Sequence, residues 1–157
     1  MKITLITVGK TDVKWVKEGL ELYTGRLSHY IQFAVSEIPE LKNASSLSRE
    51  QIKEKEGDLI LGMIRPADDV ILLDEHGKEF RSIEFASYLQ NKMASSGRNI
   101  AFVIGGAYGF SKKVYDRANS MMSLSRMTFS HQMVRTIFTE QLYRAFTIIK
   151  GEPYHHE

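Results

Sequence analysis

Three short segments hold the residues whose types and spacing could form a ligand site, and each follows an apolar run. Leu73 ends the run Val70–Leu73, and the glycine-rich loop Gly105–Gly109 follows Ile100–Ile104. In the third segment, Leu124–Phe129, small polar side chains alternate with large apolar ones. In open α/β sheets, ligands bind beyond the carboxyl ends of the strands, where such loops converge. The sequence therefore predicts one ligand site built from these three segments.

The glycine-rich loop has the form G-G-x-x-G between an expected strand and an expected helix. Glycine allows positive φ and lets a ligand lie against bare backbone. The loop is not G-x-G-x-x-G and no G-K-[ST] follows, so neither the dinucleotide fingerprint nor the P-loop is matched. The pattern fits a ligand loop and a tight structural turn equally well.

The segment Leu124–Phe129 has two interpretations. Its backbone amides and carbonyls could hydrogen-bond the edge of an adenine ring while Leu124, Met127 and Phe129 pack around that ring. The pattern by itself is more typical of a strand followed by a helix entry, with Ser130 as the N-cap.

Candidate groups for proton transfer or anion binding lie on the expected final helix, residues 131–149. His131 and Arg135 are four residues apart, and so are Glu140 and Arg144. Side chains at that spacing are neighbours on a helix surface. The second pair is also explained by an ordinary surface ion pair.

The tail after this helix, residues 151–157, contains Tyr154, His155 and His156. A terminal tail is usually frayed and polar, so a tyrosine and two histidines are unusual there. Adjacent histidines without a matching cluster are poor evidence for a metal site, and we expect no metal.

Alternating strands and helices must position these segments. Apolar alternation and short apolar runs predict strands at residues 2–8, 31–35, 70–73, 100–104 and 121–124. Helical spacing and end signals predict helices at about residues 13–30, 48–65, 82–93, 111–119 and 131–149. Such alternation predicts an α/β fold, a parallel sheet covered by helices on both faces.

Local signals predict where several elements begin and end. Asp12 is the expected cap of the first helix, and Ser48–Gln51 has the form of a capping box. Residues 39–47 read as a polar loop, and Asp74–Lys78 as a turn after the third strand.

Composition limits the class of protein. The 157 residues are 43% hydrophobic and 25% charged, which predicts a single globular domain over residues 1–157. No apolar run approaches the ~20 residues that span a bilayer, so no membrane partner is expected. The chain has no cysteine, which excludes disulfides and thiolate chemistry and is compatible with the cytoplasm.

Charge is uneven along the chain. Residues 1–97 carry 13 Lys and Arg against 15 Asp and Glu, whereas residues 98–157 carry 8 against 4. A basic C-terminal third can attract a polyanion, although ordinary surface variation explains it equally well.

The final helix has a wide apolar stripe. Its members are Val134, Ile137, Phe138, Leu142, Ala145, Phe146 and Ile149. Core burial accounts for most of this stripe, and a homodimer contact would explain the excess width.

Taken in order, several short segments resemble those of the RlmH family, large-subunit ribosomal RNA methyltransferases of the SPOUT class. They are Met1–Lys10, Lys53–Gly57, Leu73–Lys78, Phe102–Gly109, Leu124–His131, Glu140–Ala145 and Pro153–His155. Each segment is weak alone, but their order and spacing over nearly the whole chain make the resemblance specific.

The resemblance implies a SPOUT-type parallel sheet with a C-terminal trefoil knot, and a homodimer. It implies S-adenosylmethionine as methyl donor and N3-methylation of a pseudouridine in 23S rRNA, on the assembled ribosome. The cofactor contacts that it implies are at Leu73, Gly105, Leu124, Ser125, Arg126, Met127, Thr128 and Phe129.

For that reaction, the imide proton on N3 must be removed. His155 and Tyr154 are the candidate bases, with Arg135 and Arg144 stabilising negative charge or binding phosphate. We expect His131 to be structural. In a dimer, the tail could complete the partner's site.

Two positions depart from the family pattern. Ser130 stands where proline is common, which should change the rigidity of the helix entry. His156 follows Pro-Tyr-His where Arg or Lys is common, which should weaken a phosphate contact above pH ~6.5.

Two other functions compete with a methyltransferase. One is a nucleotide-binding module without catalysis, in which Gly105–Gly109 holds a mononucleotide. The other is a small flavodoxin-like redox protein. Binding of S-adenosylmethionine, ATP or a flavin distinguishes the three.

Overall fold

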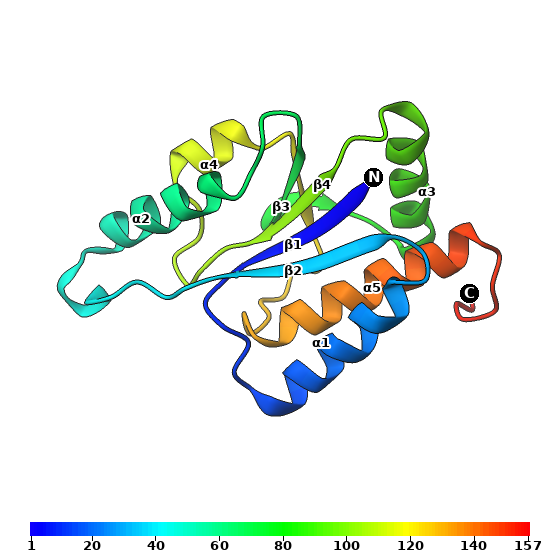
Figure 1. Ribbon diagram of the computed structural model, residues 1–157, viewed down its shortest axis with the longest axis horizontal. Helices are drawn as coiled ribbons and strands as arrows, with labels where there is room; N and C mark the ends of the chain where they lie inside the picture. Colours follow the sequence, from blue (N-terminus) through cyan, green and yellow to red (C-terminus); the bar gives the residue numbers. More distant parts are fainter.

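Five parallel strands form one sheet at the centre of the molecule (Figure 1). The computed structural model describes residues 1–157. The strands pair in the order β2-β1-β4-β3-β5, and every pair is parallel. They are β1 (Lys2–Val8), β2 (Gln32–Ile38), β3 (Asp69–Glu79), β4 (Ile100–Ile104) and β5 (Ser120–Ser123). The predicted α/β class and parallel sheet are confirmed.

Helices connect the strands and cover both faces of the sheet. They are α1 (Lys14–Leu27), α2 (Arg49–Gly62), α3 (Ser82–Ser95), α4 (Lys112–Arg117) and α5 (Met133–Ile149), with a short 3-10 turn at Ala44–Ser46. Figure 1 shows α1, α3 and α5 on one side of the sheet and α2 and α4 on the other. No helix is long and apolar enough to cross a membrane.

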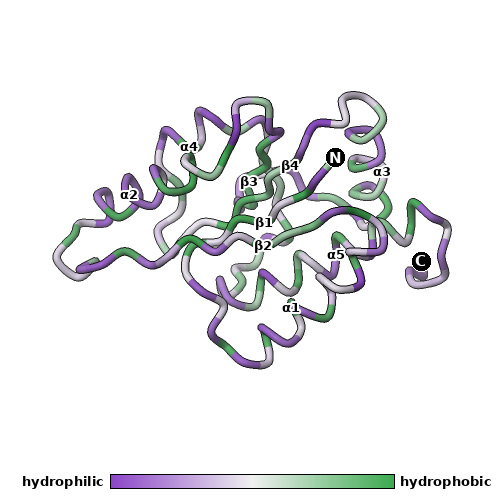
Figure 2. Tube along the Cα trace, viewed as in Figure 1, coloured by the Kyte–Doolittle hydropathy of each residue, from purple (hydrophilic) through white to green (hydrophobic).

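The strands contribute side chains to two apolar cores, because successive side chains of a strand point to opposite faces of the sheet. On β4, Phe102 belongs to the core under α3 and α5, whereas Val103 belongs to the core under α2 and α4. Both side chains are fully buried. Figure 2 shows the strands as a largely hydrophobic centre between helices whose outer faces are more polar. The stripe of α5 is mostly explained by this burial, since Phe138, Leu142 and Phe146 lie in the first core.

Most element ends agree with the sequence, but two predicted features are wrong. Asp12 does not cap α1, which begins after Val13 without a side-chain cap. Asp74–Lys78 is not a turn, because β3 continues to Glu79. The capping box of Ser48 and Gln51 is confirmed.

The reason for the longer strand is a bulge against β5. Leu73 and Lys78 both pair with Met122, so the residues between them are displaced from the ladder. A Cβ on Gly77 would lie 2.5 to 2.6 Å from backbone atoms of Met122, so glycine is required there. The bulge is set by β5, more than forty residues away in sequence, and local turn signals do not predict it. The trefoil knot stays a prediction.

Candidate active site

A cavity of about 830 Å³ opens beside the bulge of β3 and beyond the carboxyl ends of β4 and β5. It is lined by the first part of α2, by the bulged residues of β3 and by the segments that follow β4 and β5. The lining residues include Arg49, Lys53, Leu73, Asp74, His76, Ile104, Gly105, Tyr108, Gly109, Tyr115, Leu124, Ser125, Met127, Thr128, Phe129, His131 and Val134. The three segments singled out in the sequence therefore meet at one place.

The glycine loop is folded back on itself at the cavity wall. The amide of Gly109 donates to the carbonyl of Gly106 (3.1 Å), and Gly109 has φ +84°. A Cβ on Gly105 would lie 3.0 to 3.3 Å from the ring of Phe110. Gly105 therefore leaves room for the ring of Phe110 against the backbone of the loop.

The segment after β5 is held by its own serines. Ser123 Oγ donates to the carbonyl of Ser125 (2.8 Å), and Ser125 Oγ accepts from the amide of Met127 (3.0 Å). Ser130 Oγ accepts from the amides of Gln132 and Met133 in the turn before α5, but Ser130 is not the N-cap, because that position is Gln132 and it has no side-chain cap. These bonds shape the segment from within rather than by packing on the sheet.

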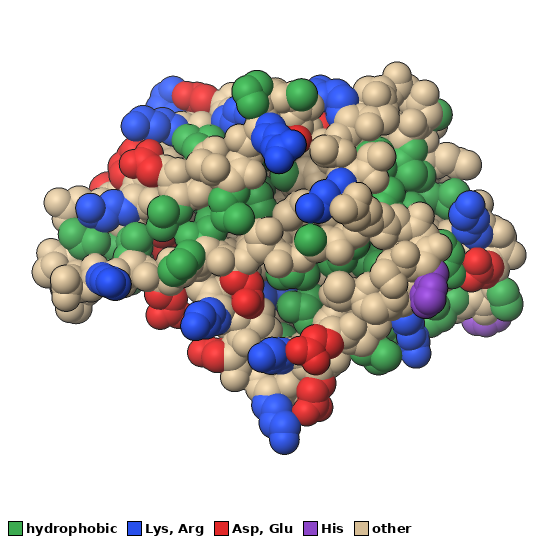
Figure 3. Space-filling model, in the orientation of Figure 1, with side chains coloured by type: hydrophobic (Ala, Val, Ile, Leu, Met, Phe, Trp, Pro, Cys, Tyr) green, Lys and Arg blue, Asp and Glu red, His purple; other side chains and the backbone are tan.

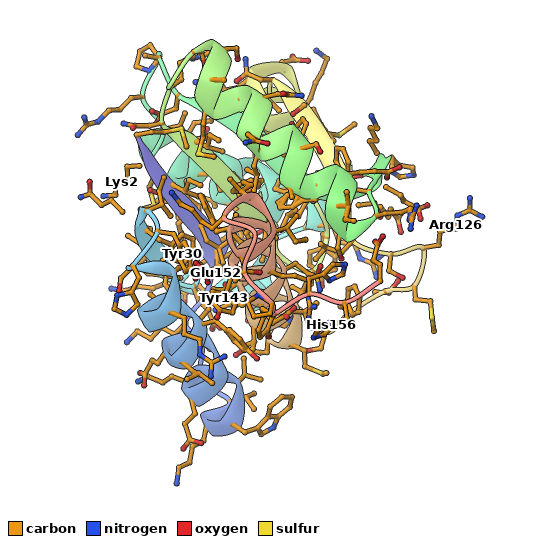
Figure 4. The ribbon with its side chains drawn as sticks, turned by 90° about the vertical axis from the view of Figure 1, so that its right-hand side faces the viewer. Lys2, Tyr30, Arg126, Tyr143, Glu152 and His156 are labelled. Atoms are coloured by element: carbon orange, nitrogen blue, oxygen red, sulfur yellow. The ribbon has the colours of Figure 1, made fainter.

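Seven of the eight residues expected to contact a cofactor line this cavity, and Arg126 does not. The side chain of Arg126 is 89% exposed and pairs with Glu79 at 3.0 Å. Figure 4 shows it pointing away from the body of the protein. Any contact of Arg126 with the cofactor must come from its backbone, because its guanidinium faces solvent.

Asp74 is an acidic group at the cavity wall that was not among the residues predicted from the sequence. The phenol of Tyr115 and the amide of His76 both donate to the carboxylate of Asp74, at 2.5 and 2.9 Å. Burial opposes ionisation of Asp74, but these hydrogen bonds outweigh burial and lower its pKa. Burial and the bond to Asp74 raise the pKa of Tyr115 to about 12. A polar residue at the end of a buried strand was the signal that could have found it.

The tail packs against α5 through a cluster of four polar side chains. Glu140 accepts from Arg144 (2.7 Å) and from the phenol of Tyr154 (3.0 Å). Arg144 also lies 3.1 Å from Nδ1 of His155, and its guanidinium sits over the ring of Tyr154 at 4.7 Å. Glu140 is therefore the centre of this cluster.

Two further bonds fix the ends of the tail. Tyr30 donates to Glu152, which raises the pKa of Tyr30 to about 12, and Arg81 lies 3.4 Å from Glu157. Figure 4 shows Tyr30, Glu152 and Tyr143 close together beside the tail, with His156 at its outer side. The tail is ordered by side-chain contacts rather than frayed.

The tail cluster does not line the cavity of its own chain. Val134, which does, precedes Glu140 and Arg144 on α5 by about 9 and about 15 Å, at ~1.5 Å per residue. The expected catalytic groups and the expected cofactor residues are therefore separated within one chain.

Arg135 has a different place from the one expected. Its side chain is 1% exposed. It donates to the carbonyls of Val8 (2.8 Å), Gly9 (2.9 Å) and His131 (3.1 Å) and to Thr11 Oγ1 (2.8 Å). Four of its five donors are used inside the protein. Arg135 therefore connects α5 to the end of β1 and the loop that follows it. The prediction that Arg135 stabilises charge on the base or binds phosphate is wrong, because its guanidinium is buried in these contacts.

His131 lies at the cavity although we expected it to be structural. Its side chain is exposed, while its carbonyl accepts from Arg135. No group of three or more His, Asp or Glu side chains is placed to hold a metal.

The sequence of the chain is similar to that of known proteins of one family. The family model described as "Predicted SPOUT methyltransferase" matches residues 1–155. The chain is 55% identical over 157 residues to ribosomal RNA large subunit methyltransferase H of Phocaeicola vulgatus, covering 100% of both chains. It is 54% identical over the same length to the proteins of that name from Parabacteroides distasonis and Bacteroides fragilis.

A solved structure also aligns with the chain. It is the SpoU methyltransferase AviRb of Streptomyces viridochromogenes in complex with AdoMet, with a TM-score of 0.46 and 10% identity. The alignment covers 96% of this chain and 61% of that one.

Proposed function

The chain belongs to the SPOUT methyltransferase family, and from this premise we propose that it methylates ribosomal RNA of the large subunit with S-adenosylmethionine as methyl donor. The acceptor that we propose is N3 of a pseudouridine in 23S rRNA on the assembled ribosome. The single SPOUT domain spans residues 1–157. We place the enzyme in the cytoplasm, with its ribosomal substrate.

One observation carries the proposal: the three strand-end segments converge on a single cavity of about 830 Å³. This volume lies within the ~300–1,000 Å³ of small-molecule sites. Leu73, Ile104, Leu124 and Phe129 offer apolar surface for a flat ring, and the glycine loop offers bare backbone. The residues present therefore fit a nucleoside-sized cofactor.

The chain's own residues have defined tasks in this proposal. Backbone groups of residues 124–129 hold the adenine edge, and Gly105 leaves room for the ring of Phe110, which lines the cavity. When bound, S-adenosylmethionine supplies a methyl group already activated by its sulfonium. The protein must then hold the acceptor nitrogen in line with that methyl group.

The tail cluster points to stabilisation of the deprotonated imide rather than to removal of its proton by a tail side chain. Arg144 can only donate, so Nδ1 of His155 accepts and the neutral ring carries its proton on Nε2. Burial, with hydrogen bonds to Tyr23 and Glu140, raises the pKa of Tyr154, so its phenol stays protonated at neutral pH. Both expected bases are thus donors in this arrangement.

We assign Arg144 and His155 to the negative charge that spreads over the imide oxygens when N3 loses its proton. His155 Nε2 is buried, makes no hydrogen bond and lies 3.5 Å from Glu157, so it reaches a substrate oxygen only when Glu157 moves aside. Preorganised donors aimed at developing charge are a large source of rate acceleration.

A homodimer would bring together the tail and the cavity, which are separated within one chain. We propose that the tail of one subunit acts at the cavity of its partner. A second hollow, of about 310 Å³, lies beside the cavity between α3 and α5. Its lining includes Phe80, Phe85, Leu124, Phe129 and Ile137, an apolar surface that a second copy can cover.

The ribosomal substrate does not require a strongly basic surface on every face. On the face in Figure 3, Lys and Arg side chains lie among acidic ones. Contacts to RNA would come from the cations at the cavity, Arg49 and Lys53, and from the tail.

Mass spectrometry of 23S rRNA from cells lacking this gene tests the function. We expect loss of one methyl group from a pseudouridine and its return when the gene is restored. Calorimetric titration of the pure protein separates the alternatives: S-adenosylmethionine should bind, whereas binding of ATP or a flavin alone would contradict a methyltransferase.

A further inference from the structure

Glu56 lies behind the glycine loop with a carboxylate that has no partner. Its Oε1 atom is buried and makes no hydrogen bond. A Cβ on Gly106 would lie 2.6 and 2.8 Å from its two oxygens, so the carboxylate lies directly against the backbone of Gly106. Gly106 itself lines the cavity, whereas Glu56 does not. One residue of backbone therefore separates this partly buried acidic group from the proposed cofactor.

The packing of α2 holds Glu56 in this position. A Cβ on the next residue, Gly57, would collide with Ser111 Oγ, so α2 approaches the start of α4 as closely as backbone allows. About two turns earlier, Arg49 lies over the ring of Tyr108 at 5.1 Å. The helix therefore contacts the C-terminal part of the glycine loop and the start of α4, and Glu56 faces Gly106.

No cation of the chain neutralises this carboxylate. On α2, Lys53 pairs with Glu50 at 3.0 Å, and from α4, Lys113 faces Asp58 at 4.0 Å. Burial raises the pKa of Glu56. A buried carboxylate without a partner is costly, and proteins normally supply a counter-charge. The chain supplies no such counter-charge to the partly buried carboxylate of Glu56, which leaves that role open to a bound cationic ligand.

We propose that Glu56 is the counter-charge, acting through the glycine loop, for the positive charge of the cofactor held at Gly105–Gly109. This inference rests on the proposed function. S-adenosylmethionine carries two candidate cations, the sulfonium and the α-ammonium. Its demethylated product, S-adenosylhomocysteine, keeps only the ammonium, and 5′-methylthioadenosine has neither.

Calorimetric titration of wild type and Glu56→Gln with these three ligands tests the proposal. Gln keeps the shape and removes the charge. We expect the affinity for S-adenosylmethionine to fall about tenfold, as one charge pair at an effective dielectric of ~20 allows. The affinity for 5′-methylthioadenosine should not change. S-adenosylhomocysteine then identifies the cation: unchanged affinity indicates the sulfonium, and an equal loss indicates the ammonium.

Glu54→Gln is the matched control, since it removes the same charge from an exposed position on the same helix. It should leave all three affinities within twofold. Glu56→Gln should also unfold at no lower temperature than wild type, because it removes an unpaired, partly buried charge.

An equal loss for all three ligands would mean that Glu56 only shapes the loop, and no loss would mean that it plays no part; either overturns the inference. Failure of wild type to bind any of the three would instead overturn the proposed function.

Discussion

The phenol of Tyr115 donates a hydrogen bond to Oδ2 of Asp74 and so ties α4 to the bulge in β3. Asp74 directly follows Leu73, one of the predicted cofactor residues. The bond therefore fixes the part of the cavity wall that is formed by Leu73 and Asp74.

Tyr115→Phe should make stability less dependent on pH in the acid range. The folded pKa of Asp74 is lowered, so near pH ~4 the unfolded chain binds more protons and stability falls as pH falls. Without the phenol donor, we expect a loss of about 1 kcal/mol at pH 7. This difference from wild type should shrink as pH falls below ~4.

Urea unfolding between pH 3 and 7 measures this effect. Tyr108→Phe is the matched control, because Tyr108 also lines the cavity but its hydroxyl makes no hydrogen bond. A gap between Tyr115→Phe and wild type that is constant over this range would rule out the linkage.

Gly105→Val should block cofactor binding. A Cβ at this position already lies 3.0 to 3.3 Å from the ring of Phe110, and the two methyl groups of valine add to the overlap. Phe110 lines the cavity, so displacing its ring changes the shape of the site, and the affinity for S-adenosylmethionine should fall at least about tenfold in calorimetry. Gly25→Ala, where a Cβ meets nothing within 4 Å, should leave the affinity unchanged. Normal binding by Gly105→Val would place the cofactor elsewhere.

His155→Gln should retain more activity than His155→Ala. If Nε2–H of His155 donates to the substrate, the amide of glutamine can replace it in part, whereas glutamine cannot act as a base. We expect kcat to fall roughly tenfold for Gln and roughly a hundredfold for Ala, within the range of single oxyanion donors. Cofactor affinity should stay within twofold in both. Equal loss in the two variants would favour a base at this position.

Deletion of residues 151–157 should abolish methylation while leaving cofactor affinity within a few-fold. If the tail acts on the partner's cavity, mixing tailless chains with Gly105→Val chains creates heterodimers in which one site is complete. Activity should then return to a measurable fraction of wild type, because the intact cavity receives the intact tail. If the mixture stays inactive although subunit exchange between the two variants has been demonstrated, the tail acts within its own chain.

Arg135→Ala should destabilise the protein rather than affect the chemistry directly. It leaves the carbonyls of Val8, Gly9 and His131 without a donor, at a cost of about 3 kcal/mol or more. Arg126→Ala, at an exposed ion pair, should cost less than about 1 kcal/mol. Urea unfolding of the two variants checks this contrast. Equal stability would contradict the structural role of Arg135.

Local sequence was sufficient for the order of strands and helices and for the three ligand segments. Apolar alternation and runs report which face of an element is buried, and parallel strands end at the same edge of a sheet. Hence Leu73, Gly105 and Leu124 could be assigned to one site before the fold was known.

Tertiary structure decided which side chains face that site. Arg135 and Arg144 look alike in sequence, but the partners of Arg135 are the carbonyls of Val8 and Gly9, 127 and 126 residues away. Likewise, Glu56 is one of several acidic residues on a charged helix, and only the approach of Gly57 to Ser111 brings its carboxylate against Gly106. Such contacts depend on packing between distant segments, which the period of a helix or strand does not encode.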